Sequence, residues 1–367
     1  MRNYFWVLFL FPYSCFVNAD DIAWENECIG YYRLQLPNDL EVGIYPAKRI
    51  YTEDSGGIKA IFGEYHEFRG QGKNVSSPYS GIYYENYLIM PSGNGFSNLN
   101  EYKERLSRRF SEHNYVYNIK NYLPYSFFAS YEYSHSLYIN KGNRLYQFMK
   151  GGGREFPPLG PNKNNFNLNN ESDTTSLLER FRTRELYEIP EEKGFCFPYG
   201  FIANDSSAED RDIAVTYRMK SHPDVMIVFQ DASYQLPYRV PLNTDLTPMK
   251  DYDAKDYAKW LWNKVYMIYP GKRELLSSGW FGSGWFSVEM DGRKGSGSFL
   301  QVTRKDGKKD YGYLAFVRAD PQNSTQKPDL QVYVSSYSFL VTKEHPQISP
   351  DELKALAEHI ISSVKRR

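Results

Sequence analysis

The alternation of apolar and polar positions predicts strands along most of the chain. Tyr32, Leu34 and Leu36 alternate with Arg33 and Gln35, which is the period of a half-buried strand. Apolar runs or alternation, together with β-branched and aromatic residues, predict further strands over residues 41–46, 58–68, 81–90, 114–120, 126–139, 144–149, 211–219, 224–231, 284–290, 296–304, 311–318 and 330–340.

Four segments carry apolar residues at spacings of three and four, which is typical of amphipathic helices. Three of them cover about residues 98–112, 175–187 and 254–268, and the fourth follows Ser349 near the end of the chain. This last helix is the best marked, because Ser349 is an N-cap, Pro350 takes the first helical position and Glu352 completes a capping box. We expect Lys365, Arg366 and Arg367 to complement the dipole at its C-terminus.

Turn signals place many of these strands in hairpins. Gly142-Asn143, Asp291-Gly292 and Asp306-Gly307 each stand between two predicted strands. Runs of strands broken by a few helices favour an α+β fold with antiparallel sheets.

A chain of 367 residues is long enough for two domains. Residues 151–174 are rich in Gly, Pro and Asn and carry little periodicity. We therefore predict an N-terminal α+β domain over residues 20–150, a linker and connecting helix over 151–190, and a C-terminal α+β domain over 191–367. Each domain is expected to be a largely antiparallel sheet with packed helices.

The first nineteen residues have the pattern of a secretory signal peptide. Arg2 precedes an apolar run over residues 4–11, and small residues then lead to Ala19 and Asp20. We predict cleavage between Ala19 and Asp20, which exports the mature chain to the periplasm.

Two other interpretations of the N-terminus fit its residues less well. A membrane anchor needs about 20 apolar residues, whereas this run is shorter and is interrupted by Pro12. A lipid-anchored form would use Cys15, but Pro12 stands where lipoprotein signals usually carry Leu. The mature form is thus expected to have no membrane span.

Export leaves two cysteines in the mature chain, Cys28 and Cys196. In an oxidising compartment they can form one disulfide, and the alternative is a pair of buried free thiols. A bond across so long a loop would stabilise the fold by about 4–5 kcal/mol in the chain-entropy model. The histidines have no ligand spacing, so no metal site is expected.

Charge and composition exclude some classes of function. The chain has 44 basic and 44 acidic residues, so it lacks the positive excess of a nucleic-acid binder. It has 33 Tyr, 23 Phe and 6 Trp, and aromatic residues are enriched at protein interfaces.

The chain lacks the local motifs of common enzymes. Neither a nucleophile elbow, a Walker loop nor a His-Glu-x-x-His motif is present, so no catalytic residue and no cofactor is predicted. Trp280 and Phe281, in Trp280-Phe-Gly-Ser-Gly-Trp-Phe286, are candidates for contact with a partner protein, although a purely structural role in a hairpin is also open.

Two segments resemble a known family. Cys28-Ile-Gly-Tyr-Tyr-Arg-Leu-Gln-Leu-Pro37 and Gly194-Phe-Cys-Phe-Pro-Tyr-Gly-Phe-Ile202 are similar to segments of type VI secretion immunity proteins that neutralise the fourth class of antibacterial lipase effectors. The terminal Ser-Pro-Asp-Glu helix is a third point of similarity. Tyr31 stands where the family often has Arg.

The resemblance implies a periplasmic protein without catalytic activity that binds a cognate lipase effector as a heterodimer. Its two domains would grip the lipase like a clamp and protect the producing cell. Two alternatives remain open at this stage, an exported hydrolase without a recognisable local motif and a surface or glycan-binding module.

Overall fold

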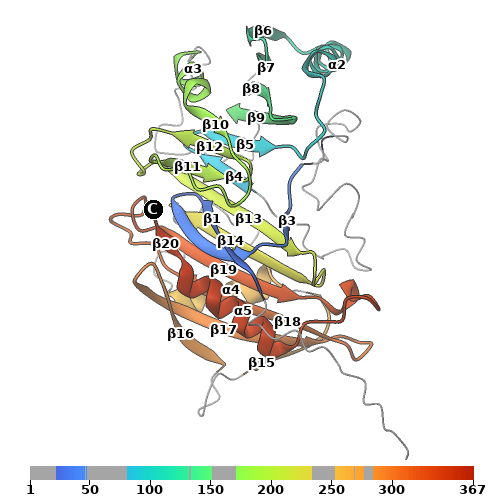
Figure 1. Cartoon of the computed structure of the whole chain (residues 1–367), viewed down its shortest axis with the longest axis vertical. Coiled ribbons are helices and arrows are strands. Elements are labelled where there is room, and N and C mark those ends of the chain that lie inside the picture. The colour runs from blue at the N-terminus through green and yellow to red at the C-terminus, as the bar shows by residue number, and fades with distance from the viewer. Residues whose placement is uncertain are drawn as a thin grey trace, which may run out of the picture.

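One antiparallel sheet runs through most of the molecule (Figure 1). The computed structural model describes residues 22–45, 47, 81–131, 134–150, 171–233, 253–267, 269–276 and 284–367. The path of hydrogen-bonded strands runs β15-β17-β18-β19-β14-β13-β4-β5-β9-β8-β7-β6, so β4 and β13 join the N-terminal and C-terminal strands.

The lower part of the sheet in Figure 1 comes from the C-terminal half of the chain. Its central strands are β13 (Arg211–Met219), β14 (Val225–Ala232), β19 (Asp329–Ser336), β18 (Lys309–Val317) and β17 (Arg293–Thr303). The outer edge of β17 pairs with β16 (Trp285–Met290) along its first half and with β15 (Lys272–Leu276) along its second half. These two short strands therefore form the lower end of the sheet.

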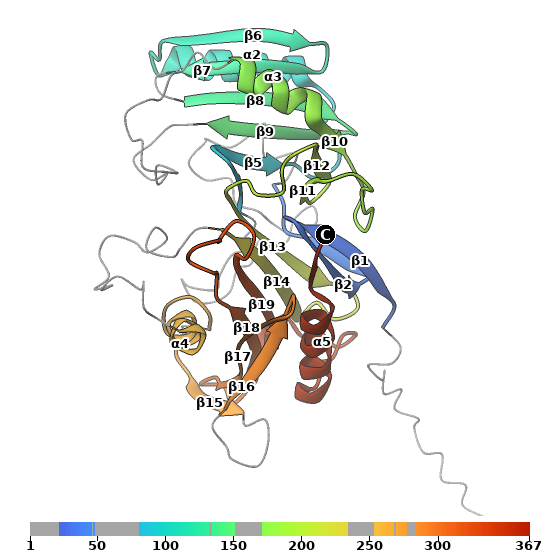
Figure 2. The ribbon, with the colours of Figure 1, turned by 90° about the vertical axis from the view of Figure 1, so that its left-hand side faces the viewer.

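The upper part is a meander of N-terminal strands. They are β4 (Gly81–Tyr84), β5 (Tyr87–Pro91), β9 (Arg144–Lys150), β8 (Ser134–Lys141), β7 (Ser126–Tyr131) and β6 (Tyr117–Leu123). β6 is the last strand of the path, and Figure 2 shows it at the top of the molecule.

Two three-stranded sheets lie where the upper and lower parts meet. One contains β1 (Trp24–Ile29), β2 (Tyr32–Pro37) and β20 (Lys365–Arg366), and the other contains β10 (Phe181–Thr183), β12 (Gly200–Ala203) and β11 (Gly194–Phe197). β3 (Leu40–Val42) follows β2 and pairs with β13. The first and last described segments of the chain thus share a sheet.

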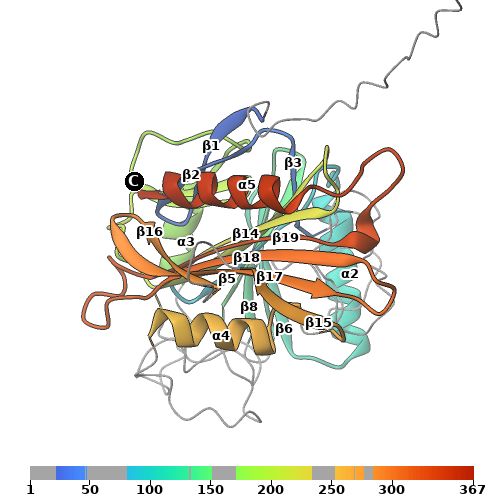
Figure 3. The same ribbon diagram turned by 90° about the horizontal axis from the view of Figure 1, so that it is seen from below.

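Among the described residues, helices α2 to α5 cover the two faces of the large sheet. Alternation explains the layers, because Tyr313 and Ala315 of β18 point into the same core as α5 (Pro350–Ser363), whereas Leu314 and Phe316 point toward α4 (Ala254–Lys264). Figure 3 shows these two helices on opposite sides of the sheet.

The upper strands are covered in the same way. Leu177 and Leu178 of α3 (Glu171–Arg180) belong to the same core as α5, and α2 (Leu99–Glu112) packs on a separate cluster that includes Phe127 and Tyr138.

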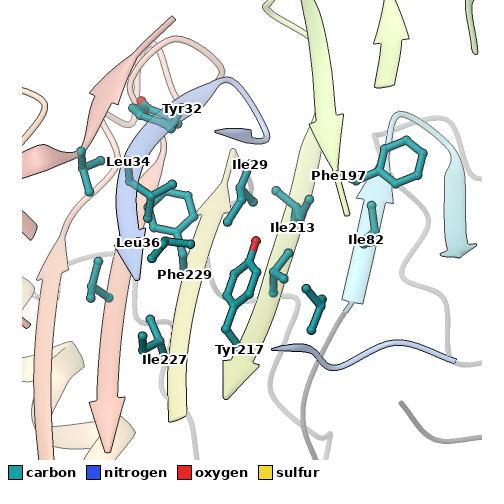
Figure 4. Close-up of a cluster of buried hydrophobic side chains, with 14 of the residues drawn as sticks. Ile29, Tyr32, Leu34, Leu36, Ile82, Phe197, Ile213, Tyr217, Ile227 and Phe229 are labelled. Atoms are coloured by element: carbon teal, nitrogen blue, oxygen red, sulfur yellow. The ribbon is translucent and has the colours of Figure 1, made fainter. Parts of the chain in front are cut away.

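The central core forms where the β1–β2 hairpin packs on β13 and β14. Figure 4 shows Ile29, Leu34 and Leu36 of the hairpin facing Ile213 and Phe229. All five side chains are fully buried. The apolar residues whose alternation predicted the strand at residues 32–37 therefore pack the β1–β2 hairpin on the C-terminal strands.

The α+β class with antiparallel sheets is confirmed, as are most predicted elements. Residues 211–219 form β13 as expected. Gly142 and Asn143 both have positive φ, 60° and 55°, as a type I′ hairpin turn requires. The division into two domains at residues 151–190 stays a prediction, and the strand expected at 58–68 lies outside the described residues.

Several predicted elements are wrong in detail. The strand predicted over 330–340 ends at Ser336 and is followed by the 3₁₀ helix η4 (Ser338–Leu340), and the helix predicted over 254–268 ends at Lys264. Residues 81–90 and 126–139 each form two strands instead of one. The helix predicted over 175–187 begins at Glu171 and ends at Arg180, because Phe181 starts β10 and pairs with β12. Lys365 and Arg366 leave α5 and pair with β2, so hydrogen bonding in a sheet takes the place of the expected helix-dipole contact.

Candidate functional site

The structure joins Cys28 and Cys196 in a disulfide, with 5.7 Å between their Cα atoms. The remaining predicted positions lie outside the described residues, namely Cys15, Ala19, Asp20, Trp280 and Phe281. Signal cleavage and the Trp280–Phe281 contact therefore stay predictions.

The disulfide connects the two small sheets. Cys28 lies at the end of β1 and Cys196 in β11, and both are completely buried. Next to the bond, the Gly30 N–H donates to the Cys196 carbonyl at 2.8 Å and the Cys196 N–H donates to the Gly30 carbonyl at 3.0 Å. One covalent bond and two hydrogen bonds thus hold the β1–β2 hairpin against β11. We call this region the junction.

A buried ion pair between Glu27 and Arg184 lies beside the disulfide. The Arg184 guanidinium also donates to the carbonyls of Cys28, Phe197, Gly200, Glu185 and Glu188. Glu27 accepts from the backbone N–H groups of Cys28 and Tyr187. Both charges therefore have hydrogen-bonding partners inside the core. Removal of either side chain would leave the other charge buried without its partner and would lower the free energy of unfolding by about 3–5 kcal/mol.

A second buried ion pair joins Arg211 of β13 to Asp231 of β14, with 2.6 Å between Nε and Oδ2. The Tyr31 ring covers the Arg211 guanidinium, 4.4 Å from its centroid, and the Tyr31 N–H donates to Asp231 Oδ2. The turn between β1 and β2 thus rests directly on this pair. Gly30 is required there, because a Cβ would lie 2.2 Å from Asp231 Oδ2 and the backbone has φ +61°.

The Tyr31 hydroxyl lies within hydrogen-bonding distance of two carboxylates, and its single proton is donated to one of them at a time. Its oxygen lies 2.8 Å from Asp205 and 2.7 Å from Glu209. Burial, together with the Asp205 charge, raises the pKa of Tyr31, so the ring stays neutral and donates. Burial raises the pKa of Asp205. For Glu209, burial is outweighed by hydrogen bonds from Tyr31 and Ser206, and its pKa is lowered.

The last two residues of the chain close the junction. The Arg366 guanidinium donates to the carbonyls of Ser207 and Gln326, and its cationic carbon lies 5.6 Å from the Tyr31 ring centroid. Arg367 donates from its backbone to the Tyr31 carbonyl and from its side chain to Cys196 Sγ. Figure 1 shows the C-terminus between the upper and lower parts.

The junction is built for rigidity. Its carboxylates bind guanidinium, amide or phenol groups within the protein. Among the described residues, no group of three His, Cys, Asp or Glu side chains is placed to hold a metal ion. In the same part of the chain, no helix has the length and apolar character to cross a membrane.

The exposed apolar side chains gather at the two ends of the sheet. Val116, Tyr117, Leu123 and Tyr125 lie on β6 or directly beside it, with exposed fractions of 87, 37, 38 and 40%. At the other end, Val265 directly follows α4, and Leu275 lies on β15. The sequence predicted a strand near β6 but carried no signal for its exposure, because exposure depends on which strand ends the sheet.

Comparisons with known proteins match part of the chain in sequence and nearly all of it in fold. Residues 188–245 match the family model described as Tle cognate immunity protein 4 C-terminal domain. A search of curated proteins gave no match.

Three solved structures have a similar fold. One is the immunity protein TplEi of the type VI secretion system from Pseudomonas aeruginosa in complex with "L" peptide, at 17% identity and TM-score 0.54, covering 94% of this chain and 98% of that chain. The apo structure of TplEi gives 15% identity and TM-score 0.54, covering 95% of this chain and 99% of that chain. The Tle4-Tli4 complex gives 15% identity and TM-score 0.54, covering 94% of this chain and 97% of the matched chain.

The matched residues include β11, β12, β13 and β14. They carry Cys196, which forms the disulfide, and Arg211 and Asp231, which form the second buried ion pair. The resemblance to type VI secretion immunity proteins for lipase effectors is therefore confirmed, in sequence over residues 188–245 and in fold over nearly the whole chain.

Proposed function

We propose that this chain is an immunity protein that binds a cognate type VI secretion lipase effector and inhibits it in the periplasm. The observation that carries this proposal is the family-model match over residues 188–245. The fold adds support, because one structural neighbour is an immunity protein solved with a peptide and another comes from a complex named for both Tle4 and Tli4.

Inhibition by such a protein needs no catalytic group of its own. A bound protein can block a lipase by covering the substrate entrance or by holding a lid in place. A partner surface that is already ordered loses less conformational entropy on binding. The disulfide and the two buried ion pairs supply that order where the upper and lower parts of this chain meet.

A clamp-like grip with both parts of the molecule is the arrangement that this rigidity favours. Two contact areas carried by one body reinforce each other, because binding of the first raises the effective concentration of the second. Loss of either area should then weaken binding by more than its own contact energy.

A disulfide between Cys28 and Cys196 also agrees with export. Such bonds persist in oxidising compartments, including the bacterial periplasm, and are rare in the cytosol. We therefore propose that the mature protein acts in the periplasm, after cleavage of the predicted signal peptide between Ala19 and Asp20.

Binding to a type VI secretion lipase, taken from a gene adjacent to this chain's gene where one is present, tests the proposal. The mature full chain should form a 1:1 complex with that lipase in size-exclusion chromatography and should abolish hydrolysis of phospholipid vesicles at equimolar ratio. Bacteria that export the lipase should survive only when they also export this chain. If the chain does not bind, or itself hydrolyses lipid, peptide or glycan substrates, the proposal is wrong.

A further inference from the structure

The disulfide at the junction ties the lower part of the molecule to the upper part. Cys28 lies in β1, whose hairpin packs on β13 and β14. Cys196 lies in β11, and the ring of the adjacent Phe197 meets those of Tyr146 and Phe148 of β9, with 6.5 and 6.4 Å between ring centroids. The bond therefore crosses from a hairpin that packs on the lower strands to a strand that packs on the upper ones.

The large sheet passes from one part to the other through a short pairing. β4 and β13 pair between Gly81–Tyr84 and Arg211–Ala214. The angle between neighbouring strands varies over roughly 10–35° from one pair to another. A pairing this short therefore leaves the angle between the two parts to the contacts around it, and the disulfide is a covalent one.

Arg367 lies against one of the two sulfur atoms. Its Nη1 is 2.9 Å from Cys196 Sγ, Nη2 donates to the carbonyls of Pro190 and Glu192, and its backbone N–H donates to the Tyr31 carbonyl. Both cysteines are fully buried, whereas Arg367 is exposed. The guanidinium thus extends a positive charge from the surface to a buried sulfur.

The other charges near this contact offset one another. Those that act on Arg367 are two acids and two bases, namely Glu192, Asp205, Arg184 and Arg33. Arg184, which donates to the Cys28 carbonyl, is itself paired with Glu27. The 2.9 Å contact therefore makes Arg367 the charge with the most direct effect on Cys196.

This charge favours the reduced form of Cys196. Sulfur without a charge is a weak hydrogen-bond acceptor, whereas a thiolate carries a full negative charge that a neighbouring arginine stabilises. Arg367 gains more from a Cys196 thiolate than from the disulfide, so its presence should make the bond easier to reduce.

Reduction by a dithiol such as dithiothreitol would use Cys196 as the leaving group. One thiolate of the reagent attacks Cys28 Sγ, the Cys28–Cys196 bond breaks, and its electron pair stays on Cys196 Sγ beside Arg367. The second thiol of the reagent loses its proton, attacks the reagent's own sulfur in the mixed disulfide and releases Cys28, which takes up a proton. The dithiol is oxidised to a cyclic disulfide, and the protein bond is reduced by two electrons.

We propose that the Cys28–Cys196 bond is a redox-sensitive latch between the two parts of the molecule, with Arg367 as the residue that stabilises its open form. The closed latch holds the β1–β2 hairpin on β11, and the protein grips the effector tightly. Once a dithiol opens the latch, the angle between the parts varies more freely and the grip weakens, because binding then has to restore the lost order. This weakening rests on the proposed function, because it assigns the effector as the partner.

The redox equilibrium of the free full chain tests the role of Arg367. At about pH 8, half reduction of Arg367→Met should need a ratio of reduced to oxidised dithiothreitol about threefold to tenfold higher than half reduction of the wild type. At about pH 5.5 the two ratios should converge, because Cys196 is then released as a thiol in both chains. Alkylation and mass spectrometry give the reduced fraction. A merely structural role of Arg367 would not produce this pH dependence.

Arg182→Met is the matched control. Arg182 is an exposed residue of β10, which β12 separates from β11, and its guanidinium donates to the carbonyls of Glu179 and Phe181. The variant removes the same charge from the same small sheet, and its half-reduction ratio should equal that of the wild type at both pH values.

Affinity for a lipase tests the latch itself. The oxidised full chain should bind a type VI secretion lipase at least about fivefold more tightly than the same chain kept reduced by dithiothreitol. The Cys28→Ser/Cys196→Ser variant should bind like the reduced chain, equally with and without the reagent, which also checks that the reagent does not act on the lipase. Both forms should keep a cooperative urea transition, so that weaker binding is not loss of the fold.

The outcomes separate this inference from the proposed function. Equal half-reduction ratios for the wild type and Arg367→Met at the higher pH, or a difference that does not change with pH, overturn the role of Arg367. Equal affinity of the oxidised and reduced chains overturns the latch and leaves the immunity function standing. If the oxidised chain does not bind, the proposed function fails, and the redox equilibrium of the free chain still decides the role of Arg367.

Discussion

Gly30 shows how a single residue can combine a backbone requirement with a buried charge. It turns the chain between β1 and β2 at φ +61°, and its missing side chain leaves room for Asp231. The motif that suggested the family from sequence contains this glycine, but the sequence alone could not say that Asp231, two hundred residues away, fills the space.

Substitution of Gly30 should therefore be costly. We expect Gly30→Ala to lower the free energy of unfolding by about 2–4 kcal/mol, since it adds a clash with the buried Arg211–Asp231 pair to the left-handed strain. Urea unfolding of the full chain measures this.

Gly307→Ala is the matched control. Gly307 also has positive φ, +81°, but a Cβ there meets nothing within 4 Å. Gly307→Ala should lower the free energy of unfolding by only about 1 kcal/mol. Equal losses in the two variants would mean that the contact with Asp231 has no energetic weight.

The two carboxylates on Tyr31 predict opposite dependence of stability on pH. Burial raises the pKa of Asp205 above its ordinary 3.8, so its protonated form is favoured in the folded state. The stability that this gives is present below pH 3.8 and is lost as the pH rises through the folded pKa. The pKa of Glu209 is lowered from 4.5, so its contribution is present at neutral pH and is lost in acid.

Substitution of each carboxylate by its amide separates the two effects. Relative to wild type, Asp205→Asn should become more stable as the pH is raised from about 3 to about 7, whereas Glu209→Gln should become less stable over the same interval. Urea unfolding at both pH values measures the two changes. Changes of the same sign would contradict the assignment.

At the scale of elements, α5 is the clearest case in which sequence specified structure. Ser349 accepts from the Glu352 N–H, and the Glu352 carboxylate accepts from the Ser349 N–H. The box was visible in the sequence because every partner lies within four residues.

Loss of this cap should be measurable. Ser349→Ala is expected to lower the free energy of unfolding by about 1 kcal/mol, since it leaves a helix N–H without its acceptor. Ser362→Ala, on the exposed face of the last turn, should change it little. Thermal unfolding of both variants gives the comparison, and equal midpoints would argue against a role for the cap.

Elements that depend on distant partners were harder to predict. The hairpin between β4 and β5 turns at Glu85, with φ 50°, and Glu gives no turn signal. Helix α3 ends at Arg180 because Phe181 pairs with Ile202 of β12. Neither fact can be read from local periodicity, because in both cases a tertiary contact decides the local structure.

At the scale of the whole molecule, sequence predicted the fold class, the disulfide and the resemblance to the immunity proteins, but not the way in which the two halves interlock. Two cysteines downstream of a predicted export signal made the Cys28–Cys196 bond a natural hypothesis. The pairing of β2 with β20 and of β4 with β13 could not be predicted, since strands carry no local mark of their partners. For the same reason the exposed edge of β6 became visible only in the fold.

Separate halves of the chain should not fold. Residues 20–188 would lose β13, β20 and α5, on which β1–β4 pack. Neither that fragment nor residues 189–367 should show a cooperative urea transition, whereas the full chain with its disulfide reduced should still unfold cooperatively, with about 2–5 kcal/mol less stability. A cooperative transition in either half would mean that the interlocking is dispensable.

The position of β20 also sets a timetable for folding. β2 is made among the first forty residues, yet the strand that completes its sheet consists of Lys365 and Arg366, which are made far later. Contacts this far apart in sequence form slowly and late. β1 and β2 can pair as soon as both have emerged, but their sheet gains its third strand only after Lys365 and Arg366 have been made.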